Sequence, residues 1–218
     1  MSAISRRSYT TALLAALLSV VISPTAFGQV SLPVSAVPDA VEEDWQLVIG
    51  EPDPIAVGPQ ITTVMCADAT DSTAPFAAFD LNYLEYPVFF AGGMQVQIWS
   101  ANAIINASSQ VGGLFNTRGE SVTWTQRMSI SGSSITYDVN NGQSTTWGKF
   151  GEGGLLRVTF PTQLTSLLNY DPDDSAKRSG ASWESNRVQR LTLVRVRYYE
   201  KGLLIATDTL PRTVVSNN

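Results

Sequence analysis

Apolar and polar residues alternate along most of the chain beyond residue 60. This period of two is typical of β-strands that bury one face, and clusters of Gly, Pro, Asn or Ser separate the alternating runs. Strands are predicted at residues 45–49, 61–65, 76–84, 94–100, 121–131, 134–139, 143–149, 155–160, 188–200 and 203–210. So many short strands with regular turns predict an all-β fold, namely a two-sheet antiparallel sandwich of the jelly-roll kind.

Helical periodicity is weak throughout the chain. The best candidate for a short helical turn is residues 163–168, which come just before the Asp171-Pro172 break. Lys201-Gly202 lies between two long predicted strands and predicts a tight hairpin there, because glycine tolerates the left-handed backbone of such turns.

The first 28 residues have the pattern of a signal peptide. Arg6 and Arg7 precede an apolar run at residues 10–22, and Ala26-Phe27-Gly28 matches a small-x-small cleavage site. The run is shorter than the roughly 20 residues that span a bilayer. Cleavage near Gly28 predicts a secreted, periplasmic or cell-surface protein without a transmembrane segment in the mature chain. The paired arginines also resemble a twin-arginine signal, so two export routes stay open.

Charge divides the mature chain into two parts. Residues 29–59 are predicted to form an extended, acidic and proline-rich segment that packs on the sandwich. Residues 60–218 are predicted to form the β-sandwich domain. Residues 29–90 hold ten acidic and no basic residues, whereas residues 91–218 hold nine acidic and twelve basic ones. We expect the acidic part to fold onto the more basic remainder; the alternative is an acidic arm that binds cations or a partner. The net charge of −5 argues against a nucleic-acid partner.

Composition removes several kinds of chemistry. The chain has no histidine, which excludes Ser-His-Asp activation and imidazole zinc sites. The single cysteine, Cys66, cannot form an internal disulfide, and its place after an apolar strand predicts a buried small hydrophobe.

Residues 191–208, LTLVRVRYYEKGLLIATD, resemble the closing strand pair of concanavalin A-like jelly rolls of the laminin-G and glucanase type. The resemblance covers this hairpin only, and it implies a sandwich with a concave, glycan-binding sheet. The E-x-D-x-x-E strand of the related glucanases is absent from the sequence, so the resemblance transfers no catalytic residue.

Polar side chains on the predicted strands form the candidate ligand-binding set. In each strand they alternate with the apolar residues that face the core, and amides, guanidinium groups and an indole suit sugar hydroxyls and anionic substituents. The set is Asp80, Asn82, Gln95, Gln97, Trp99, Arg127, Arg157, Arg195 and Arg197. Its use as one site requires that these strands share a sheet; the alternative is an ordinary solvated face.

Asp171, Asp173 and Asp174 form the densest cluster of oxygen ligands. Calcium binds such loops through six to eight oxygens, so calcium is the one cofactor that the sequence suggests. An Asp-Pro turn explains the same residues without a metal.

Three functions fit the sequence. The preferred one is a non-catalytic exported protein that binds a polysaccharide or cell-envelope glycan through one sheet face. The second is a carbohydrate-active enzyme, either a hydrolase that uses a carboxylate pair or a lyase that uses Tyr199 with Arg127 or Arg195. The third is a structural component of a surface or matrix.

Overall fold

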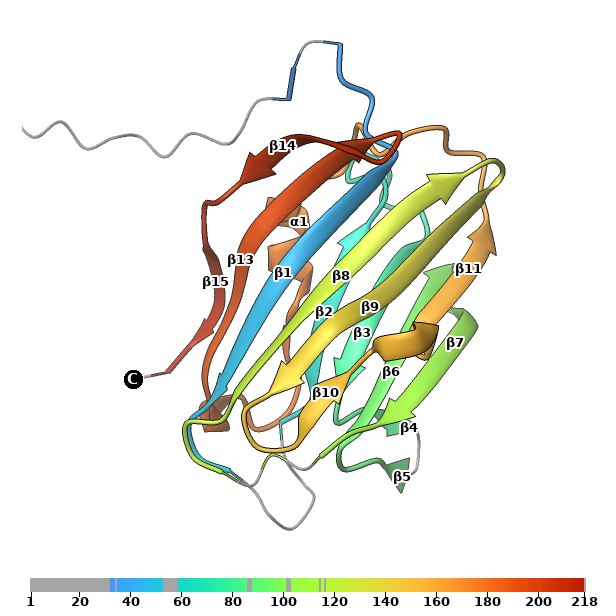
Figure 1. Cartoon of the computed structure of the whole chain (residues 1–218). Helices are drawn as coiled ribbons and strands as arrows, with labels where there is room; N and C mark the ends of the chain where they lie inside the picture. The colour runs from blue at the N-terminus through green and yellow to red at the C-terminus, as the bar shows by residue number, and fades with distance from the viewer. Residues whose placement is uncertain are drawn as a thin grey trace, which may run out of the picture.

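The computed structural model describes residues 32–33, 35–52, 59–85, 88–100, 103–113, 115 and 117–217. Within these residues two antiparallel sheets pack face to face, with the larger sheet in front in Figure 1. The chain is therefore a β-sandwich, as the alternation predicted. The signal peptide predicted at residues 1–28 lies outside the described residues.

The larger sheet has eight strands, with β1 (Ala40–Ile49) between β8 (Ser121–Ser131) and β13 (Val188–Glu200). Its other strands are β9 (Ser134–Ser144), β10 (Gly148–Phe150), β11 (Arg157–Pro161), β14 (Leu203–Asp208) and β15 (Arg212–Ser216). Strand β9 continues the sheet beyond β8 and pairs with both β10 and β11, whereas β14 and β15 both pair with β13.

The smaller sheet has five strands in the order β12-β2-β3-β6-β7. They are β2 (Ile61–Cys66), β3 (Phe76–Leu81), β6 (Gly93–Ser100), β7 (Ala103–Val111) and β12 (Gly180–Ala181). A separate two-stranded ladder joins β4 (Leu84–Glu85) to β5 (Val88–Phe89).

Inward-facing aromatic residues hold the two sheets together. Trp45 of β1 and Trp124 of β8 stack with ring centroids 6.3 Å apart, and Phe79 of β3 meets Trp124 edge to face at 5.6 Å. Leu47 and Ile49 continue the buried face of β1. Because the strand period is two, the alternate residues of β1 point to the opposite, outer face.

A polar network lies inside this core. The carboxylate of Glu43, fully buried, accepts hydrogen bonds from Trp45 Nε1 at 2.7 Å, Gln126 Nε2 at 2.9 Å and Tyr170 Oη at 2.5 Å. Gln126 Oε1 accepts in turn from Tyr137 Oη at 2.6 Å. Burial raises the pKa of Glu43 above its usual value, although hydrogen bonds from Tyr170, Trp45 and Gln126 act in the opposite direction.

One side of the sandwich is closed by α1 (Pro172–Arg178), which packs beside β2 and β15. The prediction of a helical turn at residues 163–168 is wrong, because that stretch is irregular and the helix begins only at Pro172. Asp171 is its N-cap and accepts a hydrogen bond from the Asp173 amide, and Pro172 needs no partner for an N–H in the first turn.

Two further boundaries differ from the prediction. Strand β1 begins at Ala40, five residues before the strand predicted at residues 45–49, and the boundary drawn at residue 59 would divide the larger sheet. Strands β5, β7, β12 and β15 were not predicted. Strand β9 runs from Ser134 to Ser144 without the break predicted between residues 139 and 143, and β10 follows it at Gly148–Phe150. The burial predicted for Cys66 is confirmed. None of the helices described is long and apolar enough to cross a bilayer.

Candidate ligand-binding face

A row of charged residues crosses the outer face of the larger sheet. Glu42 of β1 lies opposite Arg197 of β13 on one side and opposite Arg127 of β8 on the other. Asp138 of β9 lies opposite Arg127 and also opposite Arg157 of β11. Positive and negative side chains therefore alternate over five neighbouring strands, and we call these five residues the charge row.

Glu42 is the most heavily bonded member of the charge row. Its Oε1 accepts from Arg127 Nη1 at 2.5 Å, and its Oε2 accepts from Arg197 Nε at 3.0 Å and from Tyr199 Oη at 2.7 Å. The Arg127 guanidinium also lies 5.4 Å from the centroid of the Tyr199 ring, at cation–π distance. These contacts hold the side chains of the charge row in place, because opposite charges that face each other on adjacent strands attract.

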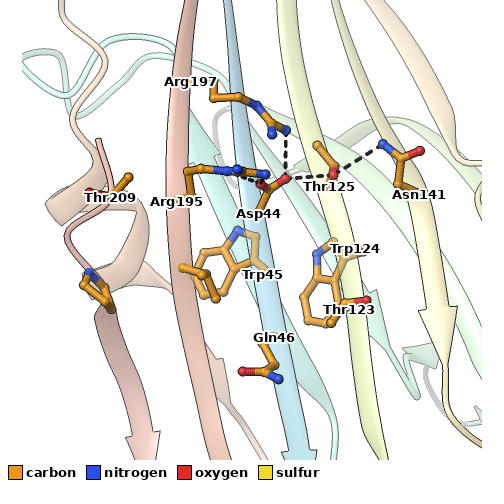
Figure 2. A pocket seen from close by; sticks show the side chains of 12 residues that line it. Asp44, Trp45, Gln46, Thr123, Trp124, Thr125, Asn141, Arg195, Arg197 and Thr209 are labelled. Atoms are coloured by element: carbon orange, nitrogen blue, oxygen red, sulfur yellow. Dashed lines mark hydrogen bonds and ion pairs between the residues drawn. The ribbon is translucent and has the colours of Figure 1, made fainter. Parts of the chain in front are cut away.

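Asp44 is the centre of a second group, two residues along β1. Arg195 contacts its Oδ2 through Nε at 2.7 Å and Nη2 at 2.6 Å, while Arg197 Nη2 and Thr125 Oγ1 each donate to its Oδ1 at 2.9 Å. Figure 2 shows Asp44 between these three side chains, with Asn141 reaching Thr125 from β9. Glu42 and Asp44 of the acidic part thus form ion pairs with arginines of the more basic remainder.

A groove lies over both groups. A hollow of about 750 Å³ opens above Asp44, between Thr209 and Pro211 on one side and Asn141 on the other. A second hollow of about 690 Å³ is lined by four members of the charge row, and Asn141 borders both hollows. The outer face therefore has two adjacent hollows that share Asn141, and we call the two together the groove.

The electrostatics of this face favour permanently charged groups. Burial opposes the charge of Arg197, but Asp44 and Glu42 outweigh it and raise the pKa of the guanidinium. Burial and the hydrogen bond to Glu42 raise the pKa of Tyr199, so its hydroxyl stays protonated and keeps donating.

Eight of the nine residues predicted to bind ligand are divided between the two sheets, and Asn82 follows the end of β3. Arg127, Arg157, Arg195 and Arg197 come together on the groove just described. Asp80, Gln95, Gln97 and Trp99 belong to β3 and β6 of the smaller sheet, on its own outer face. The expectation of one shared face is therefore wrong, because alternation shows which side of a strand is polar but not which sheet contains that strand.

The polar residues of β6 form a hydrogen-bonded ladder of their own. Trp99 Nε1 donates to Gln97 Oε1 at 2.7 Å, Gln97 Nε2 donates to Gln95 Oε1, and Gln95 Nε2 donates to Ser109 Oγ at 3.0 Å. These amides satisfy one another. The side chain of Asn82 holds two loops together, since it donates a hydrogen bond to the Pro59 carbonyl and accepts one from the Gly92 amide.

Asp80 is buried beside this ladder. Burial raises its pKa to about 6, against a smaller opposing effect of the hydrogen bond from Thr62 Oγ1. Asp80 lies on the opposite sheet from the groove, so this titration belongs to the smaller sheet.

Glu42, Asp44, Thr125 and Asn141 were not among the predicted site residues. Glu42 and Asp44 are separated by two positions in a strand, so alternation places them on one face together. That signal was present in the sequence, but a strand starting at residue 45 excluded both acids from the sheet.

The acidic cluster at α1 has other uses. Asp171 caps the helix, Asp173 pairs with Arg212, and Asp174 pairs with Arg178 at 2.8 Å. Over the described residues, no group of three or more acidic or thiol side chains gathers to hold a metal ion. Calcium binding by Asp171, Asp173 and Asp174 stays a prediction that these contacts do not favour.

Comparison with known proteins assigns no family. No family model matches the sequence, and neither does any curated protein. Among solved structures, scytalido-glutamic peptidase with a peptide-based transition state analog is 10% identical, with a TM-score of 0.34 over 84% of this chain and 85% of that one. SCP-B, a member of the eqolisin peptidases, is 11% identical, with a TM-score of 0.31 over 83% and 85%. Similarity at this level transfers no activity, and the concanavalin A-like resemblance stays a prediction.

Proposed function

We propose that the chain is an exported, non-catalytic protein that binds a polysaccharide through the outer face of its larger sheet. The observation that carries this proposal is the charge row, which spans five strands and contributes residues to both hollows of the groove. Export rests on the predicted signal peptide.

A polyhydroxylated ligand suits the groove because the face alternates donors with acceptors. Guanidinium groups of Arg127, Arg157 and Arg195 donate hydrogen bonds, whereas the carboxylates of Glu42 and Asp138 accept them. A sugar hydroxyl does both, so successive hydroxyls along a glycan can bond to both kinds of group. Thr125 and Asn141 add neutral partners at the border between the two hollows.

Binding without catalysis is favoured by where the acids lie. A general acid needs a carboxyl group that keeps its proton near neutral pH. Burial raises the pKa of Glu43, which lies inside the core, and of Asp80, which lies on the other sheet. In the groove, Glu42 and Asp44 are bonded to arginines instead.

The test is binding to a panel of neutral and acidic polysaccharides by affinity electrophoresis and calorimetry. Arg195→Ala should weaken binding about tenfold, the loss expected for a charge-assisted hydrogen bond. The matched control is Trp99→Ala on the opposite sheet, which should bind like the wild type. Unchanged binding by Arg195→Ala, or loss of binding by Trp99→Ala, would overturn the assignment of the groove. Release of reducing ends or unsaturated products would instead establish the enzyme alternative.

A further inference from the structure

We propose that the polysaccharide is a linear glycan that lies across the strands and carries one acidic group on every second sugar. This inference rests on the proposed function and adds the class of ligand. It follows from the period of the charge row, from the bonding state of its arginines, and from the carboxylates between them.

The period comes from the sheet itself. Neighbouring strands are about 4.8 Å apart, so residues of like charge, which occupy alternate strands of the row, repeat at about 10 Å. Arg127 and Arg157 are one such pair, on β8 and β11, with Asp138 of β9 between them. A pyranose unit in an extended glycan is about as long as one strand spacing. Each strand of the row therefore meets one sugar, and each arginine meets every second sugar.

The arginines of the charge row differ in how many of their N–H groups remain available to a ligand. Arg197 is largely enclosed and shared between two carboxylates, with a side chain 18% exposed. Arg127 bonds to Glu42 through Nη1 alone and its side chain is 31% exposed. Arg157 is exposed and forms no ion pair within the described part of the chain. Arg157, with Arg127 two strands away, is therefore the pair available to the oxyanions of a ligand, which guanidinium binds in bidentate fashion.

The carboxylates exclude an acid on every sugar. Asp138 lies between the two available arginines, and its Oδ2 already accepts from Asn140 Nδ2 at 2.7 Å. An anion opposite Asp138 would meet a like charge one strand spacing from its own partner, whereas a neutral sugar there can donate a hydroxyl to it. A fully neutral glycan would leave Arg157 without an anionic partner. The alternating polymer fits both kinds of position.

The experiment uses the mature chain and four polymers. The first is an alternating glucuronate–N-acetylglucosamine polymer, and the second is the same polymer after reduction of its carboxyl groups. The third is a homopolymer of uronate, and the fourth is an alternating galactan with one sulfate per disaccharide, which distinguishes carboxylate from sulfate. We expect at least one of the two alternating acidic polymers to bind about tenfold more tightly than the carboxyl-reduced polymer and the uronate homopolymer, with a preference that shrinks as salt rises.

Arg157→Gln should remove this preference, because affinity for the preferred acidic polymer should fall about tenfold, to that of the carboxyl-reduced polymer. Arg190→Gln is the matched control, because Arg190 is an exposed arginine of the same sheet outside the two hollows. If neither alternating acidic polymer bound more tightly than the carboxyl-reduced polymer, the inference would be overturned and glycan binding would remain. Tightest binding of the uronate homopolymer would overturn the alternation. Failure of all four polymers, and of the wider panel, would overturn the proposed function itself.

Discussion

Asp80 is a residue whose charge state is coupled to folding. Its pKa is raised by burial from about 3.8 to about 6, which means that the folded protein prefers the protonated form. A group with a raised pKa contributes its full stability below the unfolded pKa and loses it as pH rises through the folded pKa. The contribution of Asp80 is therefore fully present below about pH 3.8 and is lost as the pH rises through about 6.

Asp80→Asn should remove that dependence, because the amide keeps the shape and can still accept from Thr62 without ever ionising. Relative to the wild type, the free energy of unfolding of the variant should rise by up to about 3 kcal/mol between pH 4 and pH 7. Urea unfolding at a series of pH values measures this difference. Parallel curves for the two proteins would show that Asp80 does not titrate in this range.

Glu43 tests the buried network from another direction. Glu43→Ala would leave the Trp45 indole, the Gln126 amide and the Tyr170 hydroxyl without an acceptor in the core. We expect a loss of about 2–5 kcal/mol in the free energy of unfolding, since each unpaired buried donor is costly. Glu43→Gln is the control, because it keeps an acceptor oxygen for two of the donors and should lose much less. Equal losses would mean that charge, rather than hydrogen bonding, sets the stability here.

Helix α1 shows how a local pattern can indicate two different structures. Asp171, Pro172 and the two following acids fit a calcium loop and a helix start equally well, and the start is what the chain forms. Capping is a local interaction, so it was readable from the sequence. The choice between the two depended on Arg212 of β15, whose ion pair with Asp173 forms only in the tertiary structure, whereas the Arg178–Asp174 pair is local to the helix.

Asp171→Ala should therefore lower helix stability by about 1 kcal/mol, with a fall in Tm, whereas Asp171→Ser should retain most of it because serine also caps. Thermal unfolding with and without calcium tests both the capping role of Asp171 and the calcium site. A rise in Tm with calcium in the wild type, absent from Asp171→Ala, would contradict the capping assignment and establish the metal site.

The sheets show which parts of a β-sandwich its sequence determines locally. Strands β8 and β13 were predicted with the bounds that the structure gives them, because their alternation is long and their turns are distinct. The pairing of strands far apart in the chain carries no comparable signal, so Arg127 and Gln95 were expected on one face and lie on opposite sheets. Four of the nine predicted residues do share a face, because Arg127, Arg195 and Arg197 lie on the two strands that flank the acidic strand β1, and Arg157 lies on β11, which joins the same sheet through β9.

That acidic strand determines what the smallest folding unit is. Strand β1 joins β8 to β13 and buries Trp45, Leu47 and Ile49, each worth about 1.5–3 kcal/mol when fully buried. The free energy of unfolding of a domain is typically about 5–15 kcal/mol. Removal of these three residues, together with the hydrogen bonds of β1 to the strands on both sides, should cost most or all of that free energy.

A chain of residues 60–218, which begins at the boundary predicted from composition, should therefore fail to fold, whereas a chain of residues 29–218 should fold. Near-ultraviolet circular dichroism distinguishes the two, because Trp45 and Trp124 stack only when β1 is present. Addition of a peptide spanning residues 38–51 to the shorter chain should restore part of the signal, since β1 pairs along both of its edges. A cooperative, native-like transition in the shorter chain alone would show that the sandwich does not depend on its central strand, and that the acidic segment is an addition to a complete fold.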